Sequence, residues 1–233
     1  CEELKKRFKI AFNHKKDIII RHMWKNGILN GVSTKYANNQ IVSKTPFLNG
    51  IKNGDVVHLY TEKNIMLQVR YSIGLKLFVK KYVKNILVSN INFNHKYLQG
   101  KSLLYFTELG KIGKIKNLFN FNNGILEGEC LINEHDRVLK LFYKHGKLDG
   151  LQAVFTIDNK LKCLLTFVEG RLCGKYVFFN SFKKVEEGYN FNGIYNGTIT
   201  QYNPIDLSNS IYPFQNNQLE GEFVESVSLS ETR

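Results

Sequence analysis

The amino-acid sequence predicts an all-β protein: a single-layer, elongated, twisted antiparallel sheet of about nine tandem β-hairpin units of 22–24 residues. Three observations lead to this prediction. Paired glycines recur along the chain, an aromatic residue precedes most pairs by a fixed distance, and apolar residues alternate with period two between the turns. Successive side chains of a strand point to opposite faces, so a period of two indicates strands.

Glycines four residues apart mark the repeats. The complete pairs are Gly27/Gly31, Gly50/Gly54, Gly124/Gly128, Gly146/Gly150, Gly170/Gly174 and Gly193/Gly197. Three further units keep part of the pair, at Gly74/Phe78, Lys96/Gly100 and Asn217/Gly221. An irregular step before Gly128 coincides with residues 110–113 (Gly-Lys-Ile-Gly), which predict a lengthened turn. Because glycine adopts positive φ without a Cβ penalty, each pair predicts a turn between strands.

Between glycine pairs, each unit reads as strand, short turn and strand. Residues 65–71 and 161–167 alternate with period two, and turn residues stand at 37–39, 62–64, 157–159 and 203–206. Strands joined by such short links must be antiparallel neighbours. An apolar residue is expected between the paired positions, as at Leu29, Leu98, Leu126, Leu148, Leu172 and Leu219.

The aromatic residue three positions before the first glycine is interpreted as the packed core. This position holds Trp24, Phe47, Tyr71, Phe93, Phe121, Tyr143, Phe167 and Phe214. One ring in each unit suits stacked hairpins, which bury a continuous stripe. Rings that stack on nucleic-acid bases are the alternative, and these would have to face solvent.

The repeats are expected to span residues 24–225, after a basic N-terminal extension at 1–23 and before a polar tail at 226–233. A unit of this length with an aromatic residue followed by G-x-x-x-G resembles MORN repeats. The usual MORN unit continues as G-x-G, whereas this chain has Gly150-Leu151-Gln152 and Gly174-Lys175-Tyr176. In this respect it is similar to divergent variants, including those of the YwqK-type antitoxin. The resemblance implies a groove-forming sheet that joins proteins to one another or to membranes, and it is unspecific for function.

No constellation of catalytic or metal-binding residues is evident, so we expect no enzyme activity, no metal and no cofactor. The six histidines are scattered, and Cys130, Cys163 and Cys173 lack CxxC spacing. Cys163 alternates with apolar neighbours and is expected to be a buried small hydrophobe. No apolar run approaches the 18 residues that a membrane-spanning helix needs.

Positive charge is concentrated near the N-terminus. The chain carries a formal charge of +13, and residues 1–100 hold 18 Lys and Arg against 5 Asp and Glu, whereas residues 101–233 hold 15 of each. Lysine and asparagine richness is typical of AT-rich genomes of viruses or bacteria, but such a bias alone would spread lysine evenly. The candidate residues for an anionic surface are Lys5, Lys6, Arg7, Lys9, Lys15, Lys16, Arg21, Lys80, Lys81 and Lys84. Residues 5–12 also suit a short amphipathic helix. The alternative is a merely solvated face.

The favoured function is a non-catalytic repeat scaffold for protein–protein interaction, with peripheral attachment to an anionic membrane through the basic N-terminal part. An antitoxin- or immunity-type regulatory binding protein is the second hypothesis. A nucleic-acid binder is weaker, because the basic residues favour one end instead of following the repeat. We expect a cytoplasmic location, peripheral to a membrane, with a lipidated cell-envelope protein anchored through Cys1 as the minority alternative. Unpaired end strands favour end-to-end self-association.

Overall fold

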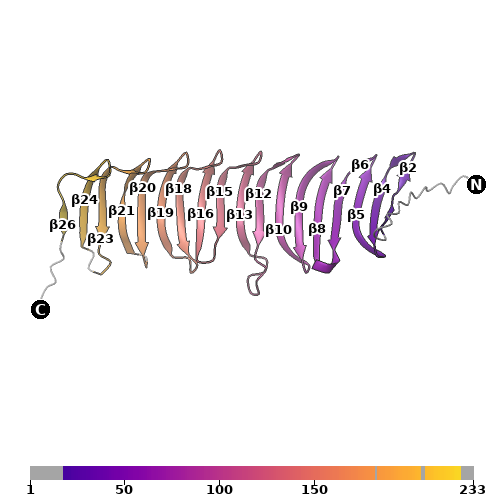
Figure 1. The fold of residues 1–233 in the computed structure, drawn as a ribbon, viewed down its shortest axis with the longest axis horizontal. Coiled ribbons are helices and arrows are strands. Elements are labelled where there is room, and N and C mark those ends of the chain that lie inside the picture. Colours follow the sequence, from indigo (N-terminus) through magenta and orange to yellow (C-terminus); the bar gives the residue numbers. More distant parts are fainter. Residues whose placement is uncertain (1–17, 182, 206–207, 227–233) are drawn as a thin grey trace, which may run out of the picture. The chain divides into compact units, whose positions relative to one another are not determined.

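The protein consists almost entirely of antiparallel strands (Figure 1). The computed structural model describes residues 18–181, 183–205 and 208–226. Within them, the one helical segment is a short 3-10 turn, η1 (Thr61–Lys63). The strands follow one another as sequential hairpins in open antiparallel sheet, which confirms the predicted fold class. The chain divides into two compact units, Cys1–Gly124 and Ile125–Arg233, and each is described by itself.

The strands of the first unit are β1 (Ile18–Arg21), β2 (Trp24–Lys25), β3 (Ile28–Leu29), β4 (Gly31–Ala37), β5 (Gln40–Leu48), β6 (Ile51–Lys52), β7 (Gly54–Tyr60), β8 (Ile65–Ser72), β9 (Leu75–Val83), β10 (Ile86–Asn94), β11 (Tyr97–Leu98), β12 (Gly100–Tyr105) and β13 (Ile115–Asn122). The long strands pair in chain order, from β1 with β4 to β12 with β13. Strand β1 lies within the predicted N-terminal extension and pairs, among the described strands, with β4 alone.

The strands of the second unit are β14 (Ile125–Leu126), β15 (Gly128–Asn133), β16 (Arg137–Lys144), β17 (Lys147–Leu148), β18 (Gly150–Thr156), β19 (Leu161–Val168), β20 (Arg171–Asn180), β21 (Lys183–Phe191), β22 (Ile194–Tyr195), β23 (Gly197–Tyr202), β24 (Asn209–Gln215), β25 (Gln218–Leu219) and β26 (Val224–Ser226). Their pairing is also sequential and antiparallel. It ends at β26, which pairs with β24.

The paired glycines form the turns that join one repeat to the next. All twelve predicted glycines have positive φ, and a second positive-φ residue precedes the first glycine of each pair, as Asn49 precedes Gly50. The N–H of that first glycine donates to a carbonyl of the preceding repeat: Gly50 to Leu29 at 2.7 Å and Gly146 to Leu126 at 2.9 Å. Most inter-repeat turns are therefore hydrogen-bonded to the turn before them, whereas the Gly193 N–H donates to the Asn190 side chain of its own repeat.

The most buried stripe lies two residues after the second glycine of each pair. It comprises Ser33, Val56, Ser102, Cys130, Gln152, Tyr176 and Ile199, all at most 8% exposed. Cross-strand register places this stripe on one face of each unit, which we call face A; the opposite face is face B. Cys163 is also buried on face A, as predicted.

The aromatic stripe that the sequence was expected to bury is only half-buried. Phe47, Tyr71 and Phe167 lie on face A with intermediate exposure, and Trp24 is 39% exposed. In a single layer of strands no second layer covers the rings, so a large side chain keeps its outer part in solvent. The most buried residues are instead mostly small or medium in size, such as Ser33, Val56 and Cys130, with Tyr176 as the large exception.

Candidate anion-binding surface

The predicted basic residues fall into two groups: those that lie outside the described residues and those on strands or turns of the first unit. Lys5, Lys6, Arg7, Lys9, Lys15 and Lys16, with the predicted helix over 5–12, lie outside the described residues. Arg21 ends β1, and its guanidinium carbon lies 5.0 Å from the centroid of the Tyr36 ring. Lys84 lies in the turn between β9 and β10 with φ 49°.

Lys80 and Lys81 project to opposite faces of the first unit. Lys81 is the cross-strand partner of Leu67 and Ser89 on face A, whereas Lys80 is the partner of Gln68 and Asn90 on face B. Neighbouring residues of a strand always separate in this way. The pair therefore contributes to two surfaces instead of one.

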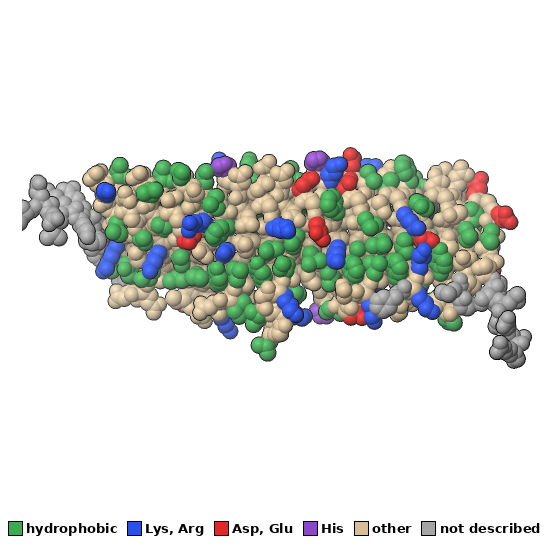
Figure 2. Space-filling view, turned by 180° about the vertical axis from the view of Figure 1, so that it is seen from behind, with side chains coloured by type: hydrophobic (Ala, Val, Ile, Leu, Met, Phe, Trp, Pro, Cys, Tyr) green, Lys and Arg blue, Asp and Glu red, His purple; other side chains and the backbone are tan. Residues whose placement is uncertain are grey.

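The charge asymmetry of the sequence coincides with the two units. Residues 18–124 carry 16 Lys and Arg against 3 Asp and Glu, while the described part of residues 125–226 carries 10 against 12. On the face that Figure 2 shows, Lys and Arg side chains stand among exposed hydrophobic ones. The basic character thus belongs to the strands of the first unit as well as to the segment before them.

Face A of the first unit brings together basic residues that are far apart in the sequence. Lys35, Ser43, His58, Leu67 and Lys81 are successive cross-strand partners along one row. Strands lie about 4.8 Å apart, so Lys35 and Lys81 each stand on the order of 10 Å from His58 along the row. No acidic residue belongs to this row within the described strands.

An open groove of about 580 Å³ lies at one end of this row, between the β4–β5 turn and η1. Lys35, Ser43, His58 and Lys63 line it, together with the acidic Glu62. Burial lowers the pKa of His58, and the nearby charges of Lys52 and Lys35 lower it further. An anion bound in the groove would offset these charges and favour protonation of the imidazole.

Lys52 and Lys76 also project from face A, each over an aromatic ring. The Lys52 Nζ lies 5.4 Å from the centroid of the Tyr71 ring, and the Lys76 Nζ lies 4.7 Å from that of Phe93. Both lysines occupy the middle of G-x-x-x-G, where we expected an apolar residue and where most units carry leucine. The sequence signal for these two residues was the replacement of leucine by lysine at the same position of two consecutive units. It becomes visible only when the units are aligned.

The acidic residues of the second unit are held in local networks. Glu187 accepts from the Tyr202 hydroxyl at 2.6 Å and pairs with Lys175 at 2.8 Å and Lys184 at 3.2 Å. The hydrogen bond from Lys175, followed by that from Tyr202, lowers the pKa of Glu187 to about 2. The same carboxylate raises the pKa of Tyr202 to about 12. These contacts neutralise Glu187 within the sheet.

Glu186 belongs to a different network on face A. It accepts from the Tyr176 hydroxyl at 3.2 Å and from the Gln201 amide at 3.1 Å. Because Glu186 and Glu187 are consecutive residues of β21, their side chains point to opposite faces. The two carboxyl groups therefore do not form a pair suited to acid–base chemistry.

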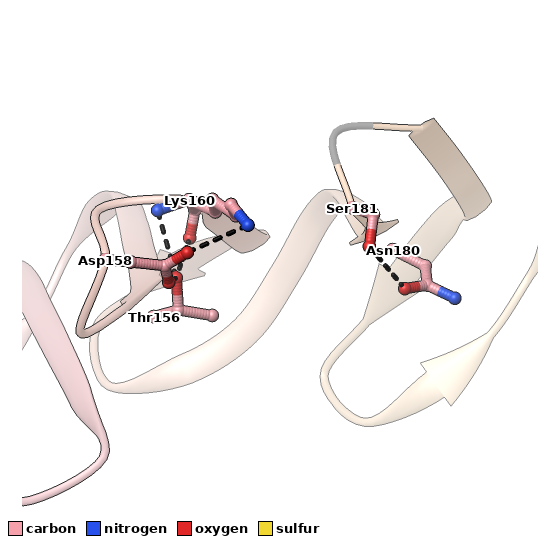
Figure 3. Close-up of polar contacts among 5 residues, drawn as sticks. All are labelled: Thr156, Asp158, Lys160, Asn180 and Ser181. Carbon is pink, nitrogen blue, oxygen red and sulfur yellow. Dashed lines mark hydrogen bonds and ion pairs between the residues drawn. The ribbon is translucent and has the colours of Figure 1, made fainter.

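Figure 3 shows a further polar cluster in the turn after β18. The Thr156 hydroxyl and the Asp158 carboxylate are hydrogen-bonded, Asp158 pairs with Lys160 at 2.9 Å, and the Lys160 backbone N–H donates to Thr156 Oγ1 at 3.0 Å. The bond from Thr156 is the main cause of the lowered pKa of Asp158. All partners lie within four residues of one another, which is typical of side chains that stabilise a turn.

Within the part of the chain that the structure describes, no group of three or more His, Cys, Asp or Glu is arranged to hold a metal ion. The described helical residues likewise include no segment long and apolar enough to cross a membrane. Comparison with models of known protein families gives no match, and comparison with curated proteins gives none either. The chain is a tandem β-hairpin repeat protein whose first unit carries most of its uncompensated positive charge.

Proposed function

We propose that this chain is a non-catalytic scaffold of divergent MORN-type repeats that binds a protein partner and is held to an anionic surface by its first unit. The observation that supports this best is the excess of 16 Lys and Arg over 3 Asp and Glu within residues 18–124. Stacked repeats form one wide, extended surface. Such a surface suits binding better than catalysis.

The positive charge of the first unit is largely unpaired. The ion pairs between its described residues are Arg70–Asp55 at 3.0 Å and Lys111–Glu108 at 3.6 Å. Lys35, Lys52, Lys76 and Lys81 form no ion pair with a described residue; all four are on face A. Each Lys or Arg close to an anionic bilayer contributes about 1 kcal/mol, so several acting together hold a protein at such a surface.

A single-stranded nucleic acid is the second candidate partner. The alternation of lysines with half-exposed rings, as in Lys52 over Tyr71 and Lys76 over Phe93, favours it. Proteins that bind single strands combine a basic groove with aromatic side chains on which bases stack. Such binding falls steeply with salt concentration, because it releases counterions.

The experiment compares charge reversal in the two units of the full chain. Lys35→Glu, Lys52→Glu and Lys81→Glu are combined in one variant, and Lys144→Glu, Lys147→Glu and Lys162→Glu in a matched control. Binding to phosphatidylserine vesicles and to a single-stranded oligonucleotide is measured at low and moderate salt. Loss of binding to either anionic probe in the first variant alone supports the proposal. Equal loss in both variants, or no binding of the unaltered chain to any anionic probe, overturns it.

A further inference from the structure

The inter-repeat turns of the first unit expose apolar side chains along one edge of the sheet. We call residues 25–29, 48–52, 72–76 and 94–98 the turn edge of this unit; Figure 1 shows such turns side by side at one edge. Ile28, Ile51, Ile73, Leu75 and Tyr97 project from it and are 42–72% exposed. Single exposed apolar residues are ordinary, but a contiguous row marks an interaction site.

Ile73 is held in a conformation that β-branched residues avoid. Its φ is 47°, whereas the equivalent turn position holds a polar residue elsewhere, such as Asn26, Asn49 or Asn123. Positive φ is strained for a β-branched side chain, and Ile73 is 72% exposed, so packing within the fold does not offset the strain. A strained and exposed isoleucine indicates a contact made outside the chain.

Lysines accompany these apolar side chains. Lys25, Lys52, Lys76 and Lys96 lie in the same four turns, and the turns contain no acidic residue. The corresponding turns of the second unit also expose apolar side chains, but acidic residues lie in or beside them. These are Glu127, Asp149, Glu169 and Glu220. The first unit alone combines apolar tips with uncompensated positive charge.

We propose that the turn edge of the first unit inserts into the headgroup region of an anionic lipid bilayer. The apolar tips enter the boundary between headgroups and acyl chains, and the lysines bind the phosphate and carboxylate groups above them, as the two faces of an interfacial helix do. Two of these turns suit such a medium because their glycine N–H groups are bonded within the sheet: the Gly50 N–H donates to Leu29 and the Gly74 N–H to Lys52.

This inference rests on the proposed function and specifies its anionic partner. Lysines serve a nucleic acid equally well, but four of the five apolar side chains of the edge, all except Tyr97, are aliphatic and offer no ring on which a base can stack. A lipid surface is the partner that gains from both kinds of side chain. The edge of turns is then the part of the first unit that enters the lipid, and Lys52 and Lys76 belong both to this edge and to face A.

The test uses the double variant Ile73→Asn with Leu75→Gln in the full chain. Ile73→Asn introduces the residue that suits positive φ, so the fold is expected to remain at least as stable. Leu109→Asn is the matched control, because Leu109 is 96% exposed in the lengthened turn of the same unit. Binding is measured by co-sedimentation with vesicles of phosphatidylcholine containing about one third phosphatidylserine. Removing two aliphatic chains that the bilayer partly buries should weaken binding roughly tenfold, and the control should leave it unchanged.

Trp24 provides a second readout, since it is the only tryptophan of the chain and adjoins the first turn of the edge. We expect its fluorescence to shift to shorter wavelength on addition of anionic vesicles. Unchanged vesicle binding in the double variant, without a shift, overturns the inference and leaves the proposed function standing. Binding to an oligonucleotide but not to vesicles does the same. Failure to bind any anionic probe overturns both.

Discussion

Gly188 in β21 leaves room for the ring of Tyr176 in the neighbouring strand. Tyr176 is 2% exposed, and its cross-strand partner is Gly188. A Cβ added at Gly188 would lie 2.7 Å from Tyr176 Oη, 2.9 Å from Cζ and 3.0 Å from Cε1. The ring cannot move away freely, because it packs 5.5 Å from Phe178 and 6.1 Å from Tyr195, measured between ring centroids. Gly188→Ala therefore forces a clash between strands.

The expected cost follows from two opposing effects. Overpacking of a filled site typically costs about 1–3 kcal/mol. Replacing glycine by alanine where φ is not positive stabilises by about 0.4–1 kcal/mol, because the unfolded chain loses freedom. Gly188→Ala should therefore lower the free energy of unfolding by about 1–2 kcal/mol, measured by urea denaturation followed by circular dichroism.

A double-mutant cycle with Tyr176→Leu tests the cause. The leucine removes the ring atoms nearest to the added methyl group, so Gly188→Ala should become neutral or slightly stabilising in that background. Tyr176→Leu will itself be destabilising, but the cycle subtracts this effect. If Gly188→Ala costs the same free energy in both backgrounds, the steric reasoning is refuted.

Three further predictions concern other buried or strained positions. Gln152→Ala leaves the Phe142 backbone N–H, now bonded to Gln152 Oε1 at 2.6 Å, without its side-chain partner; the free energy of unfolding should fall by about 1–3 kcal/mol, and an unchanged melting temperature would contradict this. Glu187 has a pKa of about 2 against an ordinary value of 4.5, so its contribution is present above about pH 4.5 and lost as pH falls toward 2. The stability difference between the unaltered chain and Glu187→Gln should shrink from pH 6 to pH 3 in urea titrations, and a constant difference would sink the assignment. Gly193→Ala and Gly74→Ala both place alanine at positive φ and should each cost about 1 kcal/mol. The cost at Gly74 should be larger, since its added Cβ meets an isoleucine methyl carbon at 3.1 Å whereas Gly193 has open space; equal thermal shifts would argue against this.

The sequence was sufficient to predict the strands and the inter-repeat turns. Positive φ at a turn favours glycine and asparagine there, so the spacing of such residues records the spacing of most turns. The residues that become fully buried were not predictable in the same way. Ring size suggested that Phe47 and Tyr71 would be the core, yet Ser33 and Gln152 are more buried. In a single layer, the burial of a side chain depends on how far it extends from the backbone of the sheet. The alternation of apolar residues in the sequence does not show this distance.

The candidate surface was predictable as a charge excess but not as an arrangement. Lys80 and Lys81 look like one cluster in the sequence, but the strand separates them onto two faces. Lys35, His58 and Lys81 are distant in sequence, and cross-strand register places them in one row. The pairings that form this row include irregularities between β4 and β5 and between β8 and β9, and no residue type marks them in advance.

The hydrogen bonds from turn glycines to the preceding turn also constrain how such a chain can change in evolution. Gly50 depends on Leu29 and Gly170 on Leu148, so such junctions are made between adjacent units by equivalent atoms. Duplication or loss of one complete unit recreates the same junction at the new boundary. Loss of half a unit instead leaves a turn amide unbonded and moves every later side chain to the wrong face, so such chains should lengthen and shorten in whole hairpins.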